Sequence, residues 1–116
     1  MSEAVQAWMK QAASHPAVSG CGVRGADRSF QIKSYRETLT EEKLTQAMRT
    51  VSEAAYGLHQ YQIYAVRLRW KFDDGAIHCI IGPGNTMGVL VLNKETVNAE
   101  GIEKLLADCP LTETGS

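Results

Sequence analysis

The sequence has few cysteines and no long apolar run. Its three cysteines, Cys21, Cys79 and Cys109, are an odd number spread along the chain, which fits reduced thiols better than a disulfide framework. The longest apolar stretch is far shorter than the roughly 20 residues that cross a bilayer. An acidic start at Ser2-Glu3 does not fit the basic region that begins a signal peptide. We therefore expect a cytoplasmic protein with no membrane partner.

The chain also lacks an excess of either charge. It carries 12 Lys and Arg against 13 Asp and Glu, a formal net charge of -1, so no overall attraction to nucleic acid or anionic lipid is expected. Arg67, Arg69 and Lys71 form one local basic row. Trp70 alternates away from them, which disfavours base stacking beside phosphate contacts. The row is interpreted as solvated or as facing a protein partner, and no nucleic-acid partner is predicted.

Sequence motifs of catalysis are missing as well. No Walker loop, G-x-S-x-G, H-E-x-x-H or C-x-x-C occurs, and the three histidines and three cysteines lack the short paired spacing of zinc ligands. His78 and Cys79 are neighbours in a predicted strand and so point to opposite faces. Asp73 and Asp74 fit a hairpin turn better than acid-base chemistry. We predict no catalytic residue, metal or cofactor, and hence no enzyme.

What the sequence does contain is a run of three strands between residues 64 and 92. Val66, Leu68, Trp70 and Phe72 alternate with the basic row, which is the period of two of a half-buried strand. Asp73-Asp74-Gly75 and Gly82-Pro83-Gly84-Asn85 supply reversals before strands at 76–81 and 87–92. The last of these is almost continuously apolar, which predicts a strand covered on both faces.

Helices and a hairpin are predicted around these strands. A first helix starts after Ser2 and ends before His15-Pro16, a hairpin joins strands at 18–24 and 30–35, and Gly20 and Gly22 predict a bulge or a closely packed helix. Thr40 caps a second helix and Asn98 a third, which Pro110 ends. The fold class is α+β, a five-stranded mainly antiparallel sheet with three helices in the order α-β-β-α-β-β-β-α. We expect a single domain over 1–116 with a loose tail from about 111.

The strand predicted from Gln62 to Phe72 lies at one edge of this sheet. It contains neither proline nor glycine, and its unpaired main chain would template association with a second copy unless the charges guard it. Pairing about a two-fold axis would bring the apolar side of the second helix against its mate. The predicted dimer interface is Leu44, Met48, Val51, Ala55, Leu58, Tyr64, Val66, Arg67, Leu68, Arg69, Trp70 and Lys71.

The order of elements and several local pieces resemble the roadblock/LC7 family over residues 4–107. The pieces are the segment 15–20 that enters the first strand, the turn at 25–29, residues 72–75 and the strand 87–92 with Asn93-Lys94 after it. Related profilin-like and longin-like sheets share much of this architecture. The resemblance implies a homodimer, or a heterodimer with a related domain, that binds or modulates a small Ras-like GTPase or serves a motor or signalling complex.

Three functions compete at this point. The first is a non-enzymatic dimeric regulator or scaffold, in which an exposed Arg36 or Arg49 could act on a bound GTPase in trans. A small-molecule sensor of profilin-like or longin-like type is the alternative, with a pocket lined by Trp8, Met9 and Met87. The third is a thiol or metal enzyme that uses Cys21 or Cys79.

Overall fold

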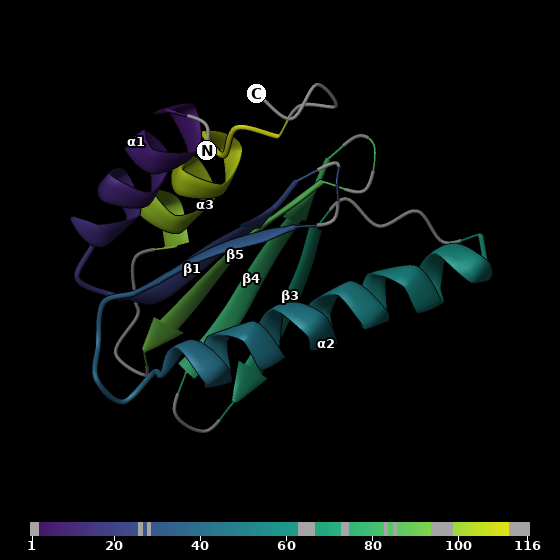
Figure 1. Ribbon diagram of the computed structural model, residues 1–116, viewed down its shortest axis with the longest axis horizontal. Coiled ribbons are helices and arrows are strands. Elements are labelled where there is room, and N and C mark those ends of the chain that lie inside the picture. Colours follow the sequence, from purple (N-terminus) through teal and green to yellow (C-terminus); the bar gives the residue numbers. More distant parts are fainter. Residues whose placement is uncertain are drawn as a thin grey trace.

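The computed structural model describes residues 3–25, 27, 29–62, 67–72, 75–82, 84, 86–93 and 99–111. The elements follow the predicted order, as Figure 1 shows. Three are helices: α1 (Glu3–Ala13), α2 (Glu41–Gln60) and α3 (Ala99–Ala107). Five are strands: β1 (Val18–Arg24), β2 (Phe30–Ser34), β3 (Arg67–Phe72), β4 (Gly75–Ile81) and β5 (Met87–Asn93). The α+β prediction is confirmed.

All five strands form one sheet in the order β2-β1-β5-β4-β3, and every neighbouring pair is antiparallel. Hence β5 lies at the centre, where its apolar run is covered from both sides, and its residues alternate between the two cores of the molecule. The strands β2 and β3 are the two edges. The prediction that the first strand of the meander is an edge strand is confirmed for Arg67–Phe72.

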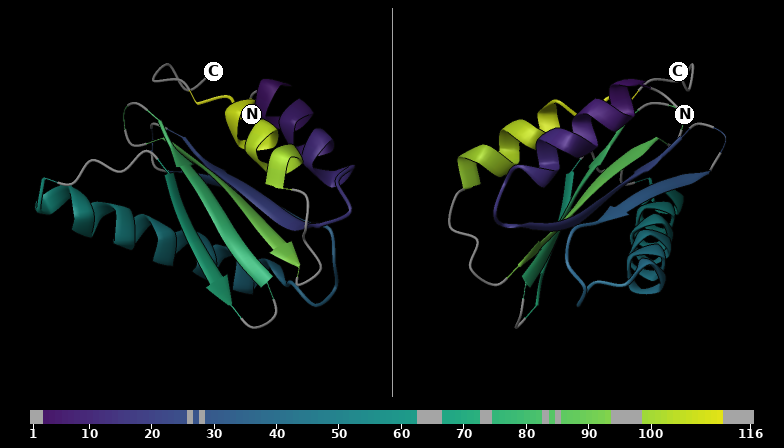
Figure 2. Two further views of the ribbon diagram at one scale, coloured as in Figure 1. Left: turned by 180° about the vertical axis from the view of Figure 1, so that it is seen from behind. Right: turned by 60° about the vertical axis from the view of Figure 1, so that its left-hand side comes forward.

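The helices lie on both faces of the sheet. Figure 2 shows α1 and α3 side by side on one face and α2 on the other. The indole N–H of Trp8 in α1 donates to the carbonyl oxygen of Leu105 in α3 over 2.7 Å, in a buried position. This bond satisfies a polar atom that would otherwise be unpaired inside an apolar layer, and it ties the two short helices together.

The predicted N-cap of α2 is confirmed, because the hydroxyl oxygen of Thr40 accepts the backbone N–H of Lys43 over 3.1 Å.

The helix α2 approaches the sheet closely because β1 lacks side chains where the helix crosses it. A Cβ on Gly22 would lie 2.6 Å from Sδ of Met48, and one on Gly20 would lie 3.3 Å from Leu44. The pairing of β1 with β5 also shifts register just before Gly20. Both features predicted from the two glycines, a bulge and a closely packed helix, are present.

One predicted boundary is wrong. Gln62 lies in the turn after α2 with φ of 62°, not in a strand, and its N–H donates to the carbonyl oxygen of His59. Leu111, near which a loose tail is predicted to begin, packs against the core beside Gly82, where an added glycine Cβ would lie 2.7 Å from the Cβ of Leu111. The predicted caps Ser2 and Asn98, the turn at 73–74 and residues 112–116 lie outside the described residues.

Within the part of the chain that the structure describes, no helix combines the length and the apolar character that a membrane span requires.

Candidate interaction surface

The edge strand β3 has two different faces. Leu68 and Trp70 point to the α2 face of the sheet, where they pack half-buried against a core cluster that includes Ile77 and Cys79. Arg67, Arg69 and Lys71 alternate to the opposite face and are exposed. On its inner side β3 pairs with β4 throughout, and no strand of the described residues lies along its outer side. An edge of this kind exposes main-chain donors and acceptors together with apolar surface.

The basic face of β3 is partly neutralised by α3. The guanidinium of Arg67 donates to the carboxylate of Glu103, and this contact lowers the pKa of the Glu103 carboxyl. His78 on β4 lies directly across from Arg69 in the sheet. Burial, and then the charge of Arg69, lower the pKa of the His78 imidazole, so it is neutral near pH 7. The row therefore carries more positive than negative charge.

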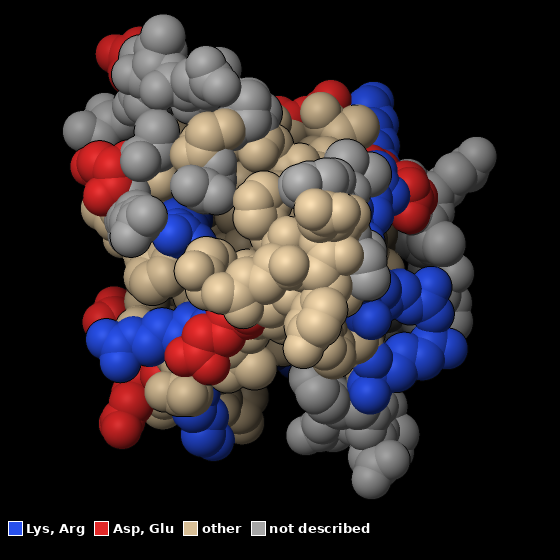
Figure 3. Space-filling view, turned by 90° about the vertical axis from the view of Figure 1, so that its right-hand side faces the viewer, with Lys and Arg blue, Asp and Glu red and all other residues tan. Residues whose placement is uncertain are grey.

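The helix α2 divides into a covered half and a projecting half. Its first half packs mainly on β2 and β1, whereas its C-terminal end extends beyond the sheet in Figure 1. Near that end the side chains of Tyr56 and Tyr61 are 65% and 81% exposed, unusually high values for large aromatic residues. Figure 3 views this end: an area without Lys, Arg, Asp or Glu occupies the centre, with Lys and Arg to its right and a mixture of Lys, Arg, Asp and Glu to its left.

The structure corrects part of the predicted interface. Leu44, Met48 and Val51 are at most 1% exposed, because they pack on this chain's own sheet and not in a seam between two helices. They leave no surface for a second subunit. Further along the same side of α2, Ala55 and Leu58 are half-buried and retain some accessible surface. Tyr64 and Val66, also predicted to lie in the interface, fall outside the described residues.

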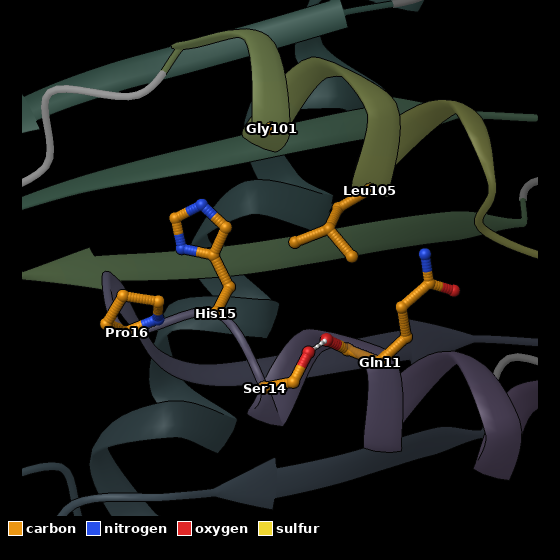
Figure 4. Close-up of a pocket in the computed structure, with 6 residues that line it drawn as sticks. All are labelled: Gln11, Ser14, His15, Pro16, Gly101 and Leu105. Atoms are coloured by element: carbon orange, nitrogen blue, oxygen red, sulfur yellow. Dashed lines mark hydrogen bonds between the residues drawn. The ribbon is translucent and has the colours of Figure 1, made fainter.

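The pocket predicted for a sensor is not formed. Trp8 and Met9 belong to the core under α1 and α3, whereas Met87 belongs to the core under α2, on the opposite face of the sheet. The sheet lies between them, so they cannot line one cavity, and all three are at most 8% exposed. An open hollow lies instead between α1 and α3, as Figure 4 shows; it is lined by Gln11, Ser14, His15, Pro16, Gly101 and Leu105. Sequence reasoning did not find this hollow, because residues far apart in the chain form it.

Cys21 and Cys79 are buried thiols, and Cys109 is partly buried. Cys21 and Cys79 lie in the cores on opposite faces of the sheet. Burial raises the pKa of both thiols, that of Cys79 to about 12. All three cysteines are free, and among the described residues no cluster of His, Cys, Asp and Glu could hold a metal ion. Neither thiolate nor metal chemistry is supported at these residues.

Comparison with solved structures identifies proteins of similar fold, whereas comparison by sequence identifies no family. No protein-family model matches the chain, and a search of curated proteins returns no match. Among solved structures, MglB of Myxococcus xanthus superposes with a TM-score of 0.65 over 93% of this chain and 89% of its own, at 11% identity. A roadblock/LC7 domain from Streptomyces avermitilis gives 0.58 over 88% and 85%, at 9% identity.

The chain has a roadblock/LC7-like fold. At these identities the likeness establishes the arrangement of the elements and transfers no residue role. The predicted resemblance to roadblock/LC7 domains is therefore confirmed at the level of architecture. Within this roadblock/LC7-like architecture, the described part of the chain leaves the outer side of β3 without a neighbouring strand and the aromatic residues at the end of α2 exposed.

Proposed function

We propose that residues 1–116 form a single cytoplasmic domain that acts as a dimeric regulatory or scaffold protein without catalytic activity of its own. Two copies pair through β3, either as a homodimer or with a related domain. The dimer presents its surface to a protein partner, for which a small Ras-like GTPase or a motor or signalling complex is the first choice. The partner class rests on the resemblance to roadblock/LC7 domains.

The main observation in support of a dimer is that β3 has no partner strand on its outer side among the described residues and carries a half-buried apolar row, Leu68 and Trp70. Leu68 and Trp70 lie on the same face of the sheet as α2. However, α2 packs mainly on β2 and β1, near the edge of the sheet that is far from β3. Pairing of two β3 strands would satisfy their main chains and bring each apolar row next to its mate. The projecting end of α2, with Leu58 half-buried and Tyr56 exposed, would then reach over the added sheet.

The revised interface is therefore smaller than the predicted one. It comprises the row on β3, from Arg67 to Lys71, with Ala55, Tyr56 and Leu58 of α2, and it leaves out the side chains that the chain buries in its own core. Tyr56 was not predicted at the interface. Its exposure is visible only once the helix is placed on the sheet, because the sequence shows it merely as an aromatic residue off the apolar side of α2.

Sedimentation velocity at micromolar concentrations tests the dimer. We expect a concentration-dependent equilibrium between one and two copies of the chain. A monomer at every concentration, in buffers of low and of high salt, would contradict the proposal for a homodimer. The test is then repeated with candidate related domains from the same source to examine the heterodimer.

The partner is tested with purified Ras-like GTPases from the same source. We expect one of them to co-sediment with the dimer in a single nucleotide state, and nucleotide hydrolysis is measured with and without the chain. Exposed Arg36 and Arg49 are replaced by alanine to test action in trans. A change in hydrolysis that disappears in one of these variants would assign that role. Binding with unchanged hydrolysis would indicate a scaffold.

A further inference from the structure

One face of β3 carries positive charge that the described chain leaves uncompensated. Arg67, Arg69 and Lys71 are exposed on the face of α1 and α3. Arg67 pairs with Glu103, and this is the single ion pair found among the described residues. Arg69 and Lys71 form no ion pair among the described residues, although the charge of Arg69 also acts on the Glu103 carboxylate. Among the described residues of this row, three cations therefore face one carboxylate, an excess of two positive charges next to an edge strand that is otherwise suited to pairing.

Pairing through β3 would double this charge on one side of the new sheet; this step rests on the proposed function. Opposite residues of an antiparallel pair always point to the same face, with Cβ atoms about 5 Å apart. In any register that overlaps the two rows, cations of one protomer therefore lie opposite cations of its partner. The dimer would carry one continuous basic stripe across its two-fold axis, and like charges placed opposite one another weaken an antiparallel pair.

We propose that this stripe is a binding site for an acidic segment of a partner protein, and that the site is complete only in the dimer. Each protomer contributes half of the stripe, from Arg67 to Lys71, a length of about 13 Å along the strand. The segment would lie across the two-fold axis with its carboxylates on the guanidinium groups and on the ammonium of Lys71.

A carboxylate partner is favoured over nucleic acid by two features of the face. The row already holds a carboxylate, that of Glu103, on Arg67. Bases would need aromatic side chains on the same face, but Trp70 packs on the other side of the sheet. The matching chemistry is a short run of Glu or Asp exposed on a protein.

Binding of an acidic segment and dimerisation would strengthen each other. The segment neutralises the repulsion that opposes pairing, and by reciprocity the paired stripe binds the segment more tightly than either half does. The dimer alone should be tighter in high salt, which screens repulsion between the cations, whereas the segment should bind more weakly in high salt. These opposite salt responses distinguish a binding site for an acidic segment from a row of solvated charges that only opposes pairing of β3.

The experiment measures the dimer dissociation constant by sedimentation equilibrium, with and without a poly-glutamate peptide, at low and high salt. The test variant is Arg69→Thr with Lys71→Thr, because threonine keeps strand propensity while it removes the charge. The control variant is Lys10→Gln with Lys33→Thr, which removes the same charge from exposed positions on α1 and on the other edge strand. Poly-lysine and a mixed-sequence single-stranded oligonucleotide serve as further probes.

For the wild type and the control variant, we expect poly-glutamate to tighten the dimer about three- to tenfold at low salt, the size of effect that a few exposed charge contacts supply. The test variant should dimerise more tightly than the wild type without peptide and should not respond to peptide. A dimer that ignores both salt and poly-glutamate would overturn the acidic site and leave the proposed dimer standing. Tightening by the oligonucleotide and not by poly-glutamate would also overturn it, whereas a monomer in every buffer would contradict the proposed function itself.

Discussion

The two edge strands of the sheet have a similar alternation of apolar and polar residues and very different surroundings. Both β2 and β3 alternate apolar with polar or basic residues, as in Phe30 and Ile32 on β2 and Leu68 and Trp70 on β3. On β2 the apolar residues lie under α2, which packs mainly against β2 and β1. On β3 none of the three described helices takes that place to a comparable extent. The alternation alone therefore does not decide whether an edge is protected or open; the position of one helix does.

The position of α2 follows in turn from two residues of β1. Gly20 and Gly22 have no side chains on the α2 face, so Leu44 and Met48 sit directly on the backbone there. Larger residues on β4 and β5, among them Ile77 and Val89, fill the same face further along the sheet. The helix packs where the side chains on this face of the sheet are smallest. It therefore covers the β2 edge and leaves the β3 edge more accessible.

The largest effect is expected from the contact that holds α2 over the β2 side. Leu44→Ala should lower the free energy of unfolding by about 2 to 5 kcal/mol, because Leu44 is fully buried and its loss leaves a cavity. Leu58→Ala removes the same atoms from a half-buried position of the same helix and should cost about 1 kcal/mol or less. Urea unfolding at one protomer concentration checks both. Equal losses would mean that the two halves of α2 are covered alike.

The next effect should distinguish the edges by association. Leu68→Glu places a carboxylate in the apolar row beside β3 and should weaken the dimer at least about 30-fold, roughly 2 kcal/mol, because pairing would desolvate the charge. The matched control is Lys33→Glu, which places the same carboxylate on an exposed position of β2. Sedimentation equilibrium measures both constants. If Lys33→Glu weakened the dimer as much as Leu68→Glu, the result would indicate that the interface involves the β2 edge and would contradict the proposed pairing through β3.

A smaller effect is expected at the start of α2, beside β2. Thr40→Ala removes the side-chain oxygen that accepts the N–H of Lys43 and should cost about 1 kcal/mol of unfolding free energy. Thr50→Ala is the control, since its exposed hydroxyl only donates back to the carbonyl oxygen of Gln46 within the helix. Thermal unfolding of both variants should show the larger fall in Tm for Thr40→Ala. An equal fall in Tm for the two variants would contradict a stabilising role of the Thr40 cap.

The smallest effect is a pH dependence on the β3 side. Burial and the neighbouring Arg69 lower the pKa of His78, while Glu103 acts in the opposite direction and Arg67 in the same one. The unfolded chain therefore binds this proton more tightly, and stability should fall as the pH drops below about 6.5. His78→Gln should flatten this part of the profile relative to His15→Gln. Unfolding measured between pH 5 and pH 8, about the range in which histidine titrates, checks it; identical profiles for both variants would contradict it.

Much of the fold was accessible from the sequence because local chemistry dictates it. Alternation in β3, the apolar run of β5 and the cap at Thr40 each report on their immediate surroundings, and the structure confirms them. Gly20 and Gly22 even indicated the helix above β1. These signals depend on neighbours within a few residues, which is the range that sequence periodicity describes.

The candidate site was less accessible, because it depends on what lies across space. Leu44, Met48 and Val51 have the spacing of a helix-to-helix seam, and the same spacing serves equally well for packing on a sheet. Trp8 and Met87 were assigned to one pocket, and only the strand order shows that they lie on opposite faces. Gln62 could not be separated from the strand that was expected to begin there, since a left-handed turn residue leaves no periodic signal.

Hydrogen exchange at low and high protein concentration tests the open β3 edge most directly. On this account the amides of Arg67–Phe72 become more protected as the concentration rises, because a second copy covers the outer side of β3, while those of Phe30–Ser34 in β2 do not change. Protection that rises in β2 instead, or in neither strand while sedimentation reports a dimer, would contradict it.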